Sequence, residues 1–159
     1  MWTLRLVANH LLTPSVHGYG GNSRIELCAS IEATLIDDFL NDKASKQLSN
    51  EERDIVLGWK KRVRGEFIME RHLKNGSIFI HMETEKVYQI SGIRSSYEEI
   101  YWSFSLPTMM KMTIIPFKDV IIFDSIAMAY PIVIGSNMKK SFKDIYMNAK
   151  KNGEIIRTM

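Results

Sequence analysis

The sequence from Met112 to Gly135 is MTIIPFKDVIIFDSIAMAYPIVIG, and it decides the fold. Ile, Val and Phe dominate this stretch, and these side chains suit a pleated, packed sheet. Lys118-Asp119 and Pro131 divide the apolar residues into runs of strand length. We therefore predict consecutive buried strands separated by a turn and a break, with a last short strand after Pro131.

The length and composition of the chain are those of an ordinary globular protein. It has 159 residues, of which 45% are hydrophobic and 25% are charged. We expect a single domain over 1–159, with an N-terminal strand, loop and helix in 1–48 and the remaining elements in 49–159. The formal net charge of +3 permits an anionic partner without requiring one.

The compartment follows from the cysteine content and the hydropathy pattern. The single cysteine, Cys28, excludes an internal disulfide and a Cys-rich zinc site. The N-terminal residues lack the ordered charged, apolar and cleavage regions of a signal peptide. The apolar run from Val120 to Ile134 is too short to cross a bilayer and contains Asp124. We expect a cytoplasmic protein with no membrane partner.

A helix is predicted immediately after residue 48. Ser49 and Glu52 have the spacing of a capping box, in which each side chain bonds the backbone amide of the other residue. We expect this helix to end at Gly65 as its C-terminal cap, with basic residues in its last turn: Lys60, Lys61, Arg62 and Arg64.

The remaining elements are predicted from their periodicity. Two strands meet at a hairpin marked by Asn75-Gly76, and a third spans residues 87–90. A final helix is expected to be capped by Ser136 and to end at Gly153, before a possible edge strand at Ile155-Ile156. Further elements are a strand over 1–13, a loop over 14–23 and helices over 25–41 and 95–102. The fold class is α+β: a small antiparallel, barrel-like sheet of about six or seven strands, with helices at the N-terminal side and one near the C-terminus.

From Ser49 onward, three blocks of sequence resemble a family of uncharacterised bacterial proteins. The first block is Trp59-Lys60 followed by GEFIMERHLKNGSIFI (65–80), and the second is LPTMMKMTIIPFKDVIIFD (106–124). The third lies in the last helix and tail: Tyr146, Ala149, Lys150, Gly153, Ile155 and Ile156. The resemblance implies no established activity. Some members carry a Cys-rich zinc motif associated with nucleic-acid or chaperone contacts, which a chain with one cysteine cannot form.

Two sets of residues are candidates for chemistry. A tight hairpin through Asn75-Gly76 would bring His72 and His81 together across two strands, with Glu70 nearby. Two imidazoles and a carboxylate are suited to metal binding or acid–base catalysis, although exposed polar residues on a half-solvated sheet would give the same pattern. Asp124 interrupts an apolar run and is explained either by a turn or by a role in a site.

Basic residues are the third candidate. They occur at the end of the helix after Ser49 (Lys60, Lys61, Arg62, Arg64), on the hairpin (Arg71, Lys74) and on the last helix (Lys139, Lys140, Lys143). If they shared one face, they would follow a phosphate backbone, and Tyr97, Tyr101 and Trp102 could stack on bases. The alternative is a solvated face on each helix.

Three functions remain open from the sequence. The leading hypothesis is a non-enzymatic, cytoplasmic protein-interaction module whose partner is another protein or a second copy in a homodimer. The first alternative is a nucleic-acid-binding module, and the second is an enzyme that uses His72, His81 and Asp124. No metal or other cofactor is expected, because the sequence contains no metal-binding, phosphate-loop or dinucleotide-binding motif.

Overall fold

The computed structural model describes residues 33–92 and 105–159, which divide into two compact units. The unit boundary lies between Lys60 and Lys61. The predicted strand over 1–13, the loop over 14–23, the first part of the helix over 25–41 and the helix over 95–102 lie outside the described residues. A single domain over 1–159 stays a prediction.

Two helices and two short 3-10 turns make up the described part of the first unit. Helix α3 spans Ala33–Asn41 and α4 spans Asn50–Gly58, with turns η1 at Lys43–Gln47 and η2 beginning at Trp59 and ending at Lys61. The predicted capping box is confirmed, because the Ser49 side chain accepts from the Glu52 amide while the Glu52 side chain accepts from the Ser49 amide.

The predicted end of α4 at Gly65 is wrong. The helix ends at Gly58, and Val63 already begins the first strand. Glycine has a low helix propensity, and Val63 pairs with Ile114 in the sheet, so strand pairing outweighs continuation of the helix. The basic residues after Trp59 therefore do not lie in a last helical turn.

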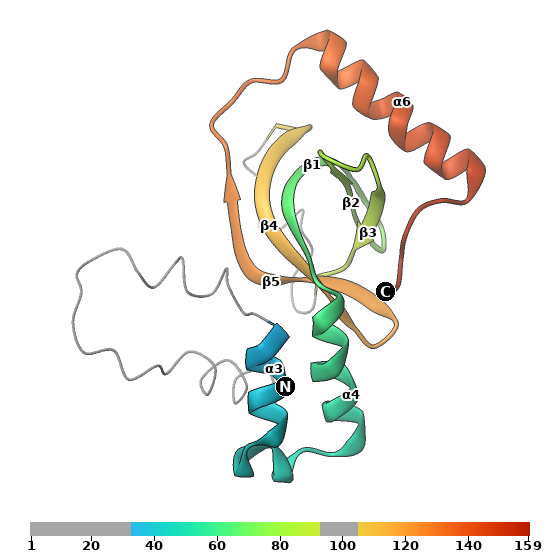
Figure 1. Cartoon of the computed structure of the whole chain (residues 1–159). Coiled ribbons are helices and arrows are strands. Elements are labelled where there is room, and N and C mark those ends of the chain that lie inside the picture. Colours follow the sequence, from blue (N-terminus) through green and yellow to red (C-terminus); the bar gives the residue numbers. More distant parts are fainter. Residues whose placement is uncertain (1–32, 93–104) are drawn as a thin grey trace, which may run out of the picture. The chain divides into compact units, whose positions relative to one another are not determined.

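Five strands form a closed barrel in the second unit (Figure 1). They are β1 (Val63–Leu73), β2 (Gly76–His81), β3 (Val87–Ile90), β4 (Thr108–Phe117) and β5 (Val120–Ala129), in the order β1-β2-β3-β5-β4. All neighbours are antiparallel except β3 and β5, which meet in parallel at Ile90 and Ile121. An isolated bridge joins Ile156 to Tyr88 beside this sheet. The predicted α+β fold with a small barrel is confirmed.

Side chains fill the barrel, and most of those that face its interior are apolar. The buried interior residues form one cluster: Phe67, Met69, Phe79, Tyr88, Ile90, Met110, Met112, Ile114 and Ile121. A small barrel has room for little more than its own side chains. Any site of this unit must therefore be sought on the outside of the barrel or at its ends.

The last helix, α6 (Ser136–Asn152), covers the outside of β1, β2 and β3 (Figure 1). Its apolar stripe of Phe142, Tyr146 and Ala149 packs against outward-facing residues of these strands: Ile68, Ile78, Ile80 and Val87. Strands covered on both faces are apolar at consecutive positions, which explains the run Phe67-Ile68-Met69.

The ends of α6 agree with the sequence in one case and differ in the other. Gly153 is the C-terminal cap as predicted, with the left-handed φ of 72° that glycine adopts readily. Ser136, however, is the first helical residue, and Gly135 occupies the cap position without a side-chain bond. The predicted Ser136 cap is therefore wrong.

The segment from Tyr130 to Gly135 is irregular, so the expected strand after Pro131 is also wrong. The β4–β5 ladder reaches its last contact where the Tyr130 amide bonds Met109 O, and the Ile132 amide then bonds Tyr130 O locally. Pro131 has no amide to donate to a continued ladder. No helix among the described residues combines the length and apolarity needed to cross a membrane.

Candidate functional site

The hairpin register separates His72 from His81. Its two turn residues place Leu73 opposite Gly76, so His72 faces Ser77, and His81 faces Phe67 near the other end of the hairpin. Ser77 and His81 are four positions apart in β2, so the two pairs are separated by about 13 Å along an extended strand. The predicted meeting of His72 and His81 is wrong, because the tight turn fixes a different register.

His81 is part of a packed strand end. Its ring is buried, Nδ1 accepts from the Thr84 amide at 3.3 Å, and Thr84 Oγ1 lies 3.1 Å from the same nitrogen. The ring also meets Phe67 edge-on with 4.9 Å between centroids. These contacts fix the turn between β2 and β3.

Among the residues that the structure describes, His72 is not part of a metal centre. His72 Nδ1 lies 2.7 Å from Ser77 Oγ across the hairpin, so its nearest partner is a hydroxyl. Within residues 33–92 and 105–159, no group of three or more His, Cys, Asp or Glu is placed to hold a metal ion. The enzyme hypothesis requires one cleft that contains His72 and His81, and the register of the hairpin places these two residues apart.

Gly65 is required where β1 passes the His81 ring. A Cβ at this position would lie 2.4 Å from His81 Nε2. Gly65→Ala should lower the free energy of unfolding by about 1–3 kcal/mol, because the ring is held by Thr84 and Phe67 and cannot withdraw freely. Urea unfolding measures this change. When His81 is also replaced by alanine, Gly65→Ala should lower the free energy of unfolding much less. An unchanged midpoint for the single variant would contradict the close approach.

Asp124 lies inside β5 rather than in a turn, so the turn interpretation is wrong. Ile114 pairs with Phe123 and Met112 with Ala127, which leaves Asp124, Ser125 and Ile126 opposite the single residue Thr113. This is a bulge, and a bulge turns a side chain out of the regular alternation. A bulge accounts for the carboxylate in an apolar run without a catalytic role.

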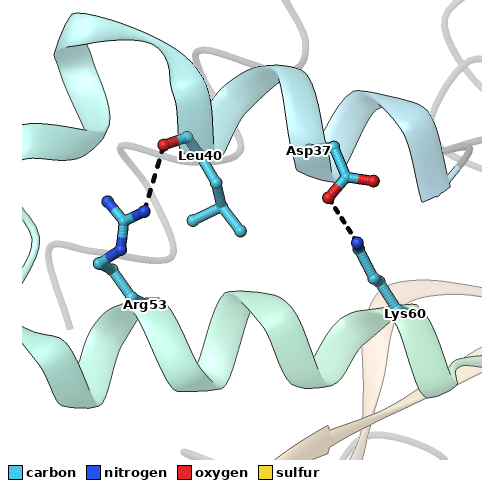
Figure 2. Close-up of polar contacts among 4 residues, drawn as sticks. All are labelled: Asp37, Leu40, Arg53 and Lys60. Atoms are coloured by element: carbon cyan, nitrogen blue, oxygen red, sulfur yellow. Dashed lines mark hydrogen bonds and ion pairs between the residues drawn. The ribbon is translucent and has the colours of Figure 1, made fainter.

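The basic residues predicted as a cluster after Trp59 differ in their contacts. Lys60 forms an ion pair with Asp37 of α3, as Figure 2 shows. In the same view Arg53 donates to the Leu40 carbonyl at 3.3 Å, which satisfies a backbone acceptor at the end of α3. Lys60 and Arg53 thus link α3 to α4.

The other basic candidates of this cluster belong to the second unit. Lys61 is exposed, Arg62 is half-buried, and Arg64 lies in β1, where it pairs with Thr113 of β4. Arg71, further along β1, forms an ion pair with Glu70, and its guanidinium lies 4.5 Å from the centre of the Tyr146 ring. The bond to Glu70 raises the pKa of Arg71, so this cation is committed to the contact between β1 and α6.

The basic residues predicted on α6 are exposed. Lys139, Lys140 and Lys143 lie on the solvent side of the helix, together with Lys150 and Lys151 near its C-terminal end. No ion pair with another described residue involves these five lysines. They are the basic candidates that the structure leaves most available to a partner.

An exposed apolar segment connects β5 to α6, and the sequence did not indicate it. Val133 is 97% exposed, Met128 58% and Ile132 51%. The expected strand after Pro131 would have buried them. The usable signal was Pro131 itself, because proline ends a ladder and leaves the following residues without strand partners.

The exposed segment is held at both ends. The Tyr130 hydroxyl donates to Glu66 Oε1 at 2.7 Å, and this bond raises the pKa of Tyr130. Ile134 is buried under α6 with the residues that support the helix. Ile132 and Val133 therefore project into solvent from a chain that is fixed on either side.

Among the described residues, part of the neighbouring edge of β5 has no strand beside it. Within the part of the chain that the structure describes, β5 meets β3 only at Ile121. Its residues Ala127–Ala129 pair with β4 on one side and have no strand on the other among the described residues. An edge of this kind can accept another strand.

Comparisons with known proteins add no further constraint. No protein-family model matches the chain, and neither a curated protein nor a solved structure does. The resemblance to a family of uncharacterised bacterial proteins, like the cytoplasmic location, stays a prediction.

Proposed function

We propose that this chain is a protein-interaction module that associates with a second copy of itself through the segment from Met128 to Val133. The observation that carries the proposal is the exposure of three large apolar side chains in this segment: Met128, Ile132 and Val133. Large apolar side chains that are close together and exposed mark contact surfaces, whereas isolated ones do not.

The position of the segment favours a second copy as the occupant. It continues directly from Ala127–Ala129 of β5, where no described strand lies on the side away from β4. Two identical edges can pair antiparallel about a twofold axis. The backbone amides and carbonyls of one edge then bond those of the other, and each copy buries the same side chains. Because Tyr130 and Ile134 already hold the segment in place, little conformational entropy would be lost on association.

Light scattering after size exclusion tests this proposal. The wild-type protein should have a mass of twice 18.4 kDa, and Val133→Asp should shift it toward the single-chain mass. A carboxylate buried at the centre of an apolar contact should weaken the dimer by about 2 kcal/mol or more. Since the Val133 side chain is almost fully exposed, the fold should be unaffected.

The matched control is Leu73→Asp, which places the same charge on another exposed apolar residue at the hairpin. It should leave the dimer intact. A wild-type mass of 18.4 kDa at every concentration would overturn self-association and assign the segment to a different protein. Equal effects of the two substitutions would show that net charge, rather than the segment, controls the mass.

A further inference from the structure

The exposed side of α6 has an uneven distribution of charge. At about 100° per residue, five lysines fall within an arc of about 120° beside the buried stripe, and only Met147 and Ser136 share that arc. We call this surface the lysine flank: Lys139, Lys140, Lys143, Lys150 and Lys151. The adjoining exposed side of the helix carries Asp144 and neutral polar residues: Asn137, Ser141, Asn148 and Asn152.

The lysine flank accounts for the positive charge of the whole chain. Subtracting its five charges from the formal net charge of +3 leaves the remaining residues at −2. Tyr146 lies one helical turn from both Lys143 and Lys150, and the Arg71 guanidinium rests on its ring, so a sixth cation borders the flank. Positive charge gathered on one surface in this way attracts polyanions.

Helix stability explains Lys150 and Lys151, which lie in the last turn, but it does not explain the other lysines of the flank. Lys139 and Lys140 lie four and three residues before Lys143, at spacings where like charges repel. They also lie toward the positive N-terminal end of the helix dipole, and the first turn has no acidic residue to compensate. Lys140 also lies four residues before Asp144, which offsets part of this repulsion, but Lys139 has no acidic residue at these spacings and points to a role in binding.

We propose that the lysine flank of α6 binds the phosphodiester backbone of a nucleic-acid duplex. Lys139 and Lys150 are eleven residues apart, about 17 Å along the helix, which matches the axial rise of about five phosphates in one strand. The apolar stripe of α6 is already buried against the barrel, so the helix has no apolar face to insert into a lipid bilayer. A hydrated phosphate backbone is the polyanion that such a surface fits. This inference is independent of self-association through Met128–Val133.

The inference is tested by fluorescence anisotropy of the full chain with a labelled DNA duplex of mixed sequence. The same measurement is made with an RNA duplex of the same sequence. If about three phosphates are contacted, the logarithm of the binding constant should fall with the logarithm of salt concentration with a slope of about −2.7. Lys139→Glu should lower affinity about tenfold and reduce the slope by about 1. Binding of both duplexes indicates backbone recognition.

Lys139→Glu separates binding from folding. It places an acid toward the helix N-terminus and a carboxylate four residues before Lys143, at the spacing that favours an ion pair on a helix. The melting temperature of this variant should therefore be equal to or above that of the wild type. The matched control is Lys46→Glu, which makes the same charge change on the exposed turn η1 and should leave affinity almost unchanged.

Three results would overturn the inference. The first is no binding of either duplex at low salt. The second is an equal loss of affinity in Lys46→Glu and Lys139→Glu, which would show that the net charge of the chain, and not the lysine flank, controls binding. The third is tighter binding to phosphatidylserine vesicles than to either duplex, with the same dependence on Lys139. That result would assign the flank to a membrane surface.

Discussion

Phe67→Ala should lower the free energy of unfolding by about 3–5 kcal/mol, the range for truncating a fully buried phenylalanine. Phe67 has no exposed surface and lies in the interior cluster. Its ring meets two other rings edge-on, with 4.9 Å between centroids to His81 and 6.1 Å to Tyr88. Truncation removes these contacts and leaves a cavity that a closed barrel cannot easily collapse around.

Denaturant unfolding followed by circular dichroism measures this effect. Phe67→Leu should cost much less than Phe67→Ala, because most of the volume is kept. Leu73→Ala, at an exposed position on the same strand, should change stability by less than about 1 kcal/mol. If Phe67→Ala were no more destabilising than Leu73→Ala, Phe67 could not lie inside the barrel.

Gly76→Ala should destabilise the protein by about 2–4 kcal/mol, because it combines backbone strain with a steric clash. Gly76 has a φ of 119°, which side chains rarely permit, and a Cβ there would lie 2.4 Å from the carbonyl oxygen of Ile90. That oxygen belongs to the backbone of β3 and cannot rotate away. The substitution therefore forces β2 and β3 apart at the start of the hairpin.

Gly153→Ala is the matched control for Gly76→Ala. Gly153 also has a positive φ, of 72°, but a Cβ there would meet nothing within 4 Å. Gly153→Ala should therefore lower the free energy of unfolding by only about 1–2 kcal/mol, the usual penalty for alanine in the left-handed region. The difference between the two variants in thermal or urea unfolding measures the clash with Ile90, and equal costs would show that the clash is relieved elsewhere.

Local signals predicted several elements of the fold correctly. The capping box at Ser49 and Glu52, the hairpin at Asn75-Gly76 and the glycine cap at Gly153 each depend on residues close in sequence. The α+β barrel followed from the apolar runs around them. The end of α4 was missed, because a row of good helix formers after Trp59 suggested continuation, while pairing of Val63 with the distant Ile114 decided the outcome.

The candidate site was less predictable, because it depends on register and exposure. The facing of His72 and His81 required a register that the two-residue turn rules out. The run Ile132-Val133-Ile134 has the composition of a buried strand, yet only Ile134 is buried. The exposure of Ile132 and Val133 depends on where the β4–β5 ladder ends, at Tyr130, and Pro131 was the local signal for that end.

The double-sided burial of β1 has a consequence for the cooperativity of the second unit. Phe67 and Met69 face the barrel interior, while Ile68 between them supports α6. A slip of β1 by one residue would exchange these roles and disturb both the interior cluster and the contact with α6. The register of this one strand therefore couples the packing of the barrel to the packing of α6.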